Sequence, residues 1–212
     1  MTTVIKVRLR FAKKDDLRLV SHHDLMRCLE RMIRRAELPV AQSQGFSPRP
    51  KMVFTLALAL GIEGRREVID IEFTEPLEPS EVLRRLNNVA PDGLDWLEAE
   101  EIPPGRAAQA DAVSYQLDVP LERREAARAA LSAVLASEHW PIVRRKADRE
   151  TTIDLRGFVL DAELDPTGVL SFRLKIQPSG SARPEDFLEA LRLHDLLTQG
   201  SILIRTEMEL VS

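Results

Sequence analysis

Strict alternation of apolar and charged or polar residues at the start of the chain constrains its fold most strongly. From Val4 to Phe11, every second side chain is apolar, which predicts a strand with one buried face because successive side chains of a strand point to opposite faces. Ser21 and Asp24 then fit the N-cap and the third position of a helix, and apolar residues follow at helical spacing up to Ala36. The chain therefore opens with a strand and an amphipathic helix.

The same two patterns continue along the rest of the chain. Up to residue 102 they predict strands at Met52–Leu60, Glu67–Phe73 and Leu94–Ile102, a hairpin loop at Gly61–Arg66 and a helix at Pro79–Val89. Residues 103–110 are rich in Pro, Gly and Ala and are typical of a linker. Beyond it the patterns predict strands at Val113–Val119, Pro141–Ala147, Thr151–Leu164, Val169–Gln177 and Ile202–Val211, with helices at Leu121–Ser137 and Pro184–Leu193.

The order of these elements is βαββαβ, and it recurs after the linker with one extra strand. It predicts an α+β chain of two tandem ferredoxin-like (βαββαβ) sandwiches, each an antiparallel sheet with helices on one face. We expect an N-terminal domain over residues 1–103, with the basic helix and a QGFSPRPK loop, and a C-terminal domain over residues 111–212. A length of 212 residues is enough for two small cores.

The single cysteine, Cys28, limits the chemistry of the chain. It excludes an internal disulfide, a four-thiolate zinc site and an iron–sulfur cluster held by this chain alone. Its helical spacing from Leu25 and Met32 indicates a packed small side chain. The first residues form no signal peptide, the longest apolar run, Leu56–Leu60, cannot cross a membrane, and glycine-rich nucleotide motifs are absent. We expect a cytoplasmic protein without membrane contact, metal or cofactor.

Charge is distributed unevenly along the chain. The net charge is −4, yet residues 1–60 carry 12 basic and 5 acidic side chains, residues 61–110 carry 5 and 12, and residues 111–212 carry 13 and 17. In the basic part, Arg27, Arg31 and Arg34 lie at helical spacing opposite the apolar stripe. Such a row repels itself, so an anionic partner would stabilise it. The alternative is an ordinary solvated face.

A polar loop follows this helix, with the sequence QSQGFSPRPK over residues 42–51. Pro48 and Pro50 stiffen it, and Gly45 permits a positive φ. Arginine, lysine and phenylalanine in such a loop suit phosphate contact and base stacking, as in the recognition of single-stranded or loop RNA. The alternative is a structural loop whose phenylalanine caps the core. The candidate binding residues here are Gln44, Gly45, Phe46, Ser47, Arg49 and Lys51.

Two adjacent histidines, His22 and His23, lie at the predicted helix start. The positive end of the helix dipole favours a neutral imidazole or a bound anion there. A neutral His22 would suit a general base acting on an RNA 2′-hydroxyl, with Lys51 or an arginine stabilising charge. Metal ligation is not expected, because adjacent helical residues point about 100° apart. His139 and His194 have no partner that the sequence indicates.

In the second half, Asp154 and Arg156 share one face of a predicted strand, and Arg173 and Lys175 lie on another strand. Opposite charges on neighbouring strands favour a cross-strand ion-pair set. This interpretation gives the four residues a structural role.

Three motifs carry a resemblance to a known family: SHHDLMR at residues 21–27, QGFSPRPK at residues 44–51 and DLR at residues 154–156. They are similar to the radical SAM-linked protein family, a domain of unknown function found beside or fused to cobalamin-binding radical SAM proteins. The resemblance covers most of the chain and is strongest over residues 5–100. His23 departs from it, standing in place of a leucine, and Gly157-Phe158 stands in place of Pro-Tyr. The resemblance implies a cobalamin-binding radical SAM protein as partner and adds Ser21, Asp24, Asp154 and Arg156 to the candidate site.

Three functions follow from these observations, in order of preference. The first is a non-catalytic RNA-binding accessory protein, which presents structured RNA such as tRNA or rRNA to a radical SAM modifying enzyme through the arginine row and the loop. The second is a metal-independent endoribonuclease that resembles the RNA-processing nucleases of CRISPR systems, with His22 as the candidate catalytic residue. The third is a protein-only adaptor that docks the radical SAM partner through the arginine row.

Overall fold

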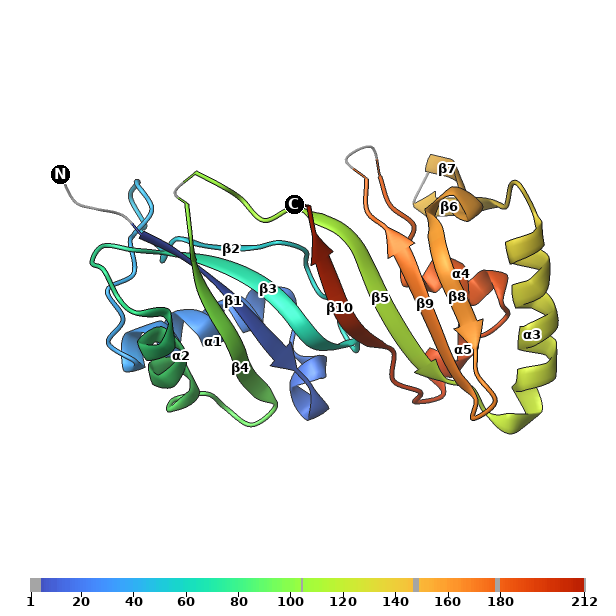
Figure 1. The fold of residues 1–212 in the computed structure, drawn as a ribbon, viewed down its shortest axis with the longest axis horizontal. Coiled ribbons are helices and arrows are strands. Elements are labelled where there is room, and N and C mark those ends of the chain that lie inside the picture. The colour runs from blue at the N-terminus through green and yellow to red at the C-terminus, as the bar shows by residue number, and fades with distance from the viewer. Residues whose placement is uncertain (1–4, 104, 147–148, 178–179, 212) are drawn as a thin grey trace. The chain divides into compact units, whose positions relative to one another are not determined.

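The computed structural model describes residues 5–103, 105–146, 149–177 and 180–211. The chain divides into two compact units, the first spanning Met1–Ala110 with Leu210–Ser212 and the second spanning Asp111–Glu209 (Figure 1). Three residues of the predicted elements lie outside the described residues: Val4, which begins a predicted strand, Ala147, which ends another, and Pro104 of the predicted linker.

The first unit contains an antiparallel sheet and two α-helices. In chain order its elements are β1 (Ile5–Lys13), the 3-10 helix η1 (Asp15–Leu19), α1 (His22–Arg35), β2 (Met52–Phe54), β3 (Glu63–Phe73), α2 (Pro79–Asn87) and β4 (Leu94–Ile102). β1 pairs with β3 on one side and with β4 on the other, and β2 pairs with β3. The strand predicted at Leu94–Ile102 is confirmed, and so is the helix predicted at Pro79–Val89, which ends two residues earlier.

The helices and the sheet of this unit share one hydrophobic core. Leu9 of β1 and Ile71 of β3 are fully buried, and they belong to the same cluster as Leu29 of α1 and Leu86 of α2. Cys28 packs against the cluster, as its helical spacing predicts. Burying a side chain of this size contributes about 1.5–3 kcal/mol, so the apolar stripe of α1 is what holds the helix on the sheet.

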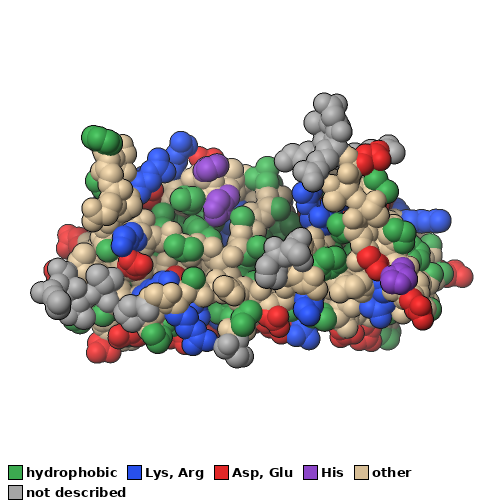
Figure 2. Space-filling model, turned by 90° about the horizontal axis from the view of Figure 1, so that it is seen from above, with side chains coloured by type: hydrophobic (Ala, Val, Ile, Leu, Met, Phe, Trp, Pro, Cys, Tyr) green, Lys and Arg blue, Asp and Glu red, His purple; other side chains and the backbone are tan. Residues whose placement is uncertain are grey.

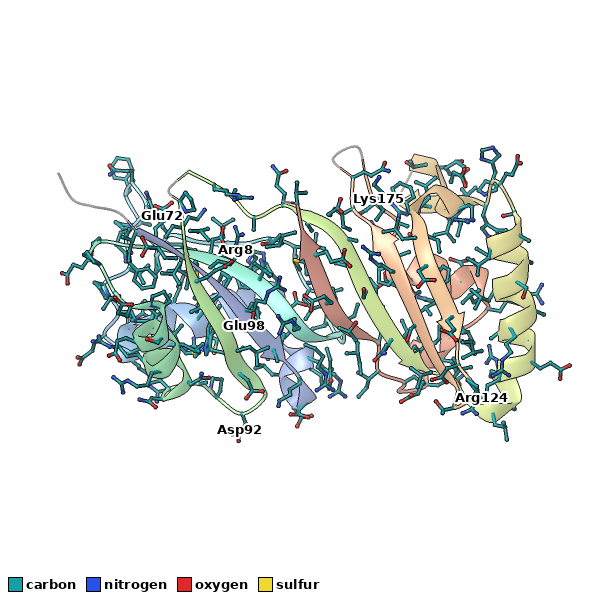
Figure 3. All side chains as sticks on the ribbon, in the orientation of Figure 1. Arg8, Glu72, Asp92, Glu98, Arg124 and Lys175 are labelled. Carbon is teal, nitrogen blue, oxygen red and sulfur yellow. The ribbon has the colours of Figure 1, made fainter. Side chains whose placement is uncertain are left out.

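The polar side of β1 is buried as well, which corrects the prediction of a strand with one buried face. Lys6 and Arg8 are only 7% and 9% exposed, and both pair with Asp70 of β3, at 3.2 Å from Lys6 Nζ and 2.9 Å from Arg8 Nε (Figure 3 labels Arg8). The linker supplies further partners, since Lys6 Nζ donates to the Arg106 carbonyl at 2.8 Å and the Ala108 N–H donates to Asp70 at 3.2 Å. The buried charges of this face are stabilised by ion pairs and hydrogen bonds within the protein, in place of the water molecules that would solvate them on an exposed face.

The strand predicted at Met52–Leu60 is too long, and the hairpin loop predicted at Gly61–Arg66 is wrong. β2 ends at Phe54, and β3 already begins at Glu63. Between them runs a loop in which Leu58 and Ile62 are buried, while Leu60 is 65% exposed. The apolar residues at every second position are therefore not all buried here, and the part of the pattern after Phe54 forms a loop that packs on the core.

The second unit is also a sheet with helices. Its elements are β5 (Ala110–Asp118), α3 (Leu121–Ala136), β6 (Pro141–Lys146), β7 (Arg149–Asp154), the 3-10 helix η2 (Leu155–Phe158), β8 (Val159–Leu164), β9 (Val169–Lys175), α4 (Pro184–Ala190), α5 (Asp195–Thr198) and β10 (Ile204–Leu210). β5 lies between β10 and β9, β8 pairs with β9, and β6 and β7 form a separate two-stranded sheet.

Two predictions for this unit need correction. The single strand predicted at Thr151–Leu164 is interrupted by η2, because Asp154 caps a helical turn with its carboxylate instead of continuing the strand. The helix predicted at Pro184–Leu193 ends at Ala190, and Arg192 adopts a positive φ of 58°, before the short α5 follows.

The chain therefore has a mixed α+β fold with mostly antiparallel sheet and few helices, which confirms the predicted class. Among the described residues, no helix is both long and apolar enough to cross a bilayer.

Candidate nucleic-acid interface

Basic and acidic side chains are interspersed over the molecular face drawn in Figure 2. Total charge alone does not locate a binding surface on such a face. The residues that the sequence singled out must therefore be judged by their local geometry.

The QGFSPRPK loop is a closed hairpin. Gln42 forms an isolated antiparallel bridge with Pro50, and the Ser43 N–H donates to the Arg49 carbonyl at 2.8 Å. In return the Arg49 N–H donates to Ser43 Oγ at 3.0 Å. Below these contacts the Lys51 N–H donates to the Ala41 carbonyl at 2.7 Å. Hydrogen bonds between the two arms of the hairpin thus fix its stem, and the tip projects beyond the stem.

The tip of this hairpin presents an aromatic ring to solvent. Phe46 has a relative exposure of 111%, and its neighbours Gln44, Gly45 and Ser47 are exposed as well. Gly45 has a φ of 139°, a backbone conformation in which a residue with a side chain would be strained. Phe46 does not cap the core. Leaving such a ring in water forgoes about 1.5–3 kcal/mol of burial, which a partner that covers the ring would recover.

Two basic residues follow the ring along the second arm of the hairpin. Arg49 is exposed, and its guanidinium group forms no ion pair or hydrogen bond with another described residue. Lys51 lies at the base, where its Nζ is 2.9 Å from Oε2 of Glu72 on β3 (Glu72 is labelled in Figure 3). Arg49 is therefore available to an anion, whereas Lys51 is partly neutralised.

α1 carries the predicted arginine row on its exposed side. The helix begins as predicted, because the Ser21 hydroxyl accepts the Asp24 N–H at 3.2 Å and donates to Asp24 Oδ2 at 2.8 Å. Arg27 pairs with Asp24 at 3.2 Å, one turn into the helix. Arg31 and Arg34 are exposed, and neither has an ion pair or side-chain hydrogen bond with the described part of the chain. The positive charge of the row is thus least compensated toward the C-terminal end of α1.

His22 lies at the other end of the helix and packs on an aromatic ring. Its ring centroid is 4.8 Å from that of Phe54, in an edge-on arrangement. Burial lowers the pKa of His22, and the positive charges of His23 and Lys13 lower it further. Lys13 is itself buried, and its Nζ donates to the Val20 carbonyl at 2.7 Å. This shift favours the neutral imidazole of His22, the form that a general base requires.

The structure does not bring His22 and the hairpin together. β2 separates them, because Phe54 at its C-terminal end touches His22, whereas the hairpin leads into its N-terminal end at Met52. β2 pairs antiparallel with β3, with Met52 opposite Ile71 and Phe54 opposite Ile69. α1 runs from His22 to Arg35 and so ends toward the hairpin. Arg31 and Arg34 thus lie in the half of α1 that leads to the hairpin, whereas His22 is the first residue of the helix.

Asp154 and Arg156 in the second unit form a turn and not a shared strand face, which corrects the prediction. Asp154 accepts the N–H of Trp140 at 2.8 Å and that of Arg156 at 3.2 Å, and it lies 2.7 Å from His139 Nδ1. His139, expected to be without a partner, is therefore paired. The hydrogen bond from His139 and those from the two N–H groups lower the pKa of Asp154. Arg156 Nη1 donates to the Val159 carbonyl at 3.0 Å.

The predicted ion-pair set on the strands is wrong, because no two of its four members form an ion pair with each other among the described residues. Arg173 of β9 pairs instead with Glu209 of β10. Asp154 and Arg156 do not join it, because their side chains are used in the η2 turn. Within the described ranges, no three His, Cys, Asp or Glu side chains are grouped as ligands of a metal ion.

Sequence reasoning missed a second group of arginines. Arg84 and Arg85 of α2 line a hollow with Arg35, just past the arginine row. Arg84 and Arg85 follow Glu81 by three and four positions, the spacing of neighbours on one helix face. This spacing is visible in the sequence and could have indicated the group.

The fold and this surface define a class of protein: a mixed α+β chain with an arginine-bearing helix and an exposed aromatic hairpin. A family described as an uncharacterized protein conserved in bacteria (DUF2344) has a model that matches residues 6–184. This range is most of the chain, and the chain belongs to that family.

Other comparisons add little. No curated protein sequence matches the chain. Among solved structures, the crystal structure of an unknown protein from Galdieria sulphuraria is 12% identical, with 99% of this chain and 100% of that chain covered and a TM-score of 0.29. A score this low carries no argument about fold or function.

Proposed function

We propose that the protein is a non-catalytic RNA-binding accessory that presents structured RNA, such as tRNA or rRNA, to a radical SAM modifying enzyme. The observation that carries the proposal is the fully exposed ring of Phe46 on a hydrogen-bonded hairpin, with the unpaired Arg49 beside it. An unstacked base binds to such a ring through its π face, at about 1–3 kcal/mol per base.

The arginines of α1 supply the second element of RNA recognition. Arg31 and Arg34 extend the positive charge from the hairpin end of the unit along the helix. Guanidinium groups suit phosphate because their N–H donors match the spacing of its oxygens. Stacking at the hairpin and phosphate contacts on the helix together favour a folded RNA with an accessible loop.

The proposed partner is a cobalamin-binding radical SAM protein acting with this chain in the cytoplasm. Its support is the resemblance of the SHHDLMR, QGFSPRPK and DLR motifs and the presence of only one cysteine, Cys28. The iron–sulfur cluster of radical SAM chemistry takes several thiolates, so the partner would have to hold it.

We further propose that both units are ferredoxin-like sandwiches. In the first unit, β2, β3, β1 and β4 follow one another across an antiparallel sheet, and in the second the corresponding order is β8, β9, β5 and β10. The same relative order supports one topology repeated in tandem, with β6 and β7 as an addition to the second copy.

Crosslinking of the native protein to RNA in cells, followed by sequencing, tests the RNA partner directly. The purified protein with Arg27→Glu and Arg31→Glu should then bind the recovered RNA more weakly and with a shallower salt dependence. The log–log slope should fall by about 0.7 for each single-strand phosphate that the variant no longer neutralises. Arg128→Glu with Lys175→Glu, in the second unit, makes the same change of charge and should leave binding intact.

Two outcomes would overturn the RNA proposal. One is the absence of RNA crosslinks together with no binding by the wild-type protein. The other is capture of the radical SAM partner that survives nuclease treatment and is lost in the arginine variant, which would support the protein-only adaptor.

The lowered pKa of His22 favours a second candidate function, a metal-independent endoribonuclease. It predicts cleavage of RNA in EDTA that is lost in His22→Ala. Labelled RNA that stays intact after prolonged incubation would exclude it.

A further inference from the structure

A hollow of about 310 Å³ lies between the C-terminal end of α1 and the second half of α2. Arg35 and Glu37 line it from the side of α1, Arg84 and Arg85 line it from α2, and Asn88 lines it from the C-cap of α2. It directly follows the arginine row, because Arg35 is the next residue after Arg34.

Glu81 holds two of these arginines in place. Arg84 reaches its carboxylate with Nε at 2.8 Å and Nη2 at 2.7 Å, and Arg85 reaches it with Nε at 2.6 Å. The two guanidinium groups lower the pKa of Glu81 to about 2, so the carboxylate stays charged at all physiological pH values. Arg85 Nη1 also donates to the Glu37 carbonyl at 3.3 Å. Because these contacts already hold Arg84 and Arg85, the two side chains lose less conformational entropy on binding a ligand than free arginines would.

Positive charge remains in excess around the hollow. Arg35 is exposed, and no side-chain contact with the described residues neutralises it. Three guanidinium groups therefore face two carboxylates, those of Glu37 and Glu81. Glu81 is shared between Arg84 and Arg85, while Nη1 of Arg84 has no acceptor among the described residues. The hollow offers N–H donors from two helices to an anion with several oxygens.

We propose that this hollow binds one phosphate group of the RNA backbone, between Arg35 and Arg84. The inference rests on the proposed RNA-binding function and extends the interface from α1 onto α2. It places the RNA at the hairpin end of α1 and away from His22. A free phosphate ion offers the same chemistry, so the test must separate the two sources.

RNA binding measured over a series of salt concentrations tests the subsite. Arg35→Gln and Arg84→Gln should each weaken binding about tenfold, because each removes one charge-assisted hydrogen-bonding group. Each should also lower the log–log salt slope by about 0.7. Arg128→Gln, which removes the same charge from the second unit, is the matched control, and thermal melting confirms that each variant folds.

Titration with inorganic phosphate at constant ionic strength gives a readout that needs no RNA. The NMR signals of the Arg35 Nε–H and the Asn88 side-chain amide should shift, and Arg84→Gln should weaken that shift. If the wild type binds RNA but both hollow variants match Arg128→Gln, the subsite is wrong and the proposed function stands. If phosphate shifts the signals and no RNA binds, the site takes a free anion, and the RNA assignment is overturned. If neither ligand binds, both proposals fail.

Discussion

Nδ1 of His139 lies 2.7 Å from Oδ2 of Asp154, although 15 positions separate the two residues. The other carboxylate oxygen of Asp154 accepts the backbone N–H of Trp140 at 2.8 Å and of Arg156 at 3.2 Å. One side chain thus ties the segment after α3 to the η2 turn. Asp154 belongs to the DLR motif, and these contacts give that motif a structural role.

This arrangement predicts acid sensitivity of the second unit. The folded pKa of Asp154 lies below its ordinary value of 3.8, so its contribution to stability is complete above that value and is lost as pH falls through the folded pKa. The melting temperature of the unit should therefore drop below about pH 4, and Asp154→Asn should remove part of that drop. Trp140 fluorescence in a Trp96→Phe background reports this unit. The exposed Asp118→Asn is the control, and an undiminished drop in Asp154→Asn would contradict the interpretation.

The buried charges of the first unit predict a large loss on removing their shared carboxylate. Asp70→Asn leaves Lys6 and Arg8 buried without a counter-ion. Its free energy of unfolding should fall by about 3–5 kcal/mol. Urea unfolding followed by Trp96 fluorescence measures this loss. Glu72→Gln breaks the exposed pair with Lys51 and should lower the free energy of unfolding by only about 0–1 kcal/mol. Equal effects of the two variants would show that the Asp70 cluster is not a buried ion network.

The lowered pKa of His22 predicts a second pH effect, near neutrality. Its folded pKa lies below the ordinary 6.5, so the unfolded chain takes up the proton first and the first unit loses stability as pH falls below 6.5. His22→Phe keeps an aromatic contact with Phe54 and removes the titration, so its stability should depend less on pH in this window. His23→Phe removes only one of the lesser causes of the lowered pKa, so it should keep more of the wild-type dependence than His22→Phe does. Urea midpoints at several pH values decide between these outcomes, and identical slopes for all three proteins would refute the prediction.

The exposed ring at the hairpin tip predicts a change in binding without a change in folding. Phe46→Ala removes no buried surface, so its free energy of unfolding should stay within about 0.5 kcal/mol of the wild type. Its RNA affinity should weaken by about 1–3 kcal/mol, the stacking energy of one base. Phe46→Trp keeps a stacking surface and should bind as well as the wild type. Fluorescence anisotropy with labelled RNA measures both variants. A loss of binding in Phe46→Trp equal to that in Phe46→Ala would argue against stacking.

Side-chain periodicity predicts the regular elements of this chain well and its loops poorly. β4 has the bounds that its alternation predicts, Leu94–Ile102. Alternation also predicts a strand up to Leu60, where the chain forms a loop that buries Leu58. Leu60, on the same face of the predicted strand, is exposed, so a loop that buries only some of its apolar residues gives the same sequence signal as a strand.

The candidate site could be predicted only where it depends on local spacing. The arginine row follows from helical periodicity, and the structure places Arg27, Arg31 and Arg34 on the exposed side of α1. The sequence leaves two positions open for Phe46, exposed for stacking or buried as a cap on the core, because phenylalanine is usually buried. The structure shows the exposed one, on a hairpin whose stem is hydrogen-bonded. The contact of His139 with Asp154 depends on the pairing of two distant segments, which no local pattern contains.

The covering of Asp70 by the segment after β4 has a practical consequence. A fragment cut at residue 103, where the strand pattern stops, would lack the carbonyl of Arg106 that Lys6 binds and the N–H of Ala108 that Asp70 accepts. Truncation there would open the buried charges to water. Anyone isolating the first unit should therefore carry the fragment past Ala108, since residues that look like a spacer in the sequence serve as part of its wall.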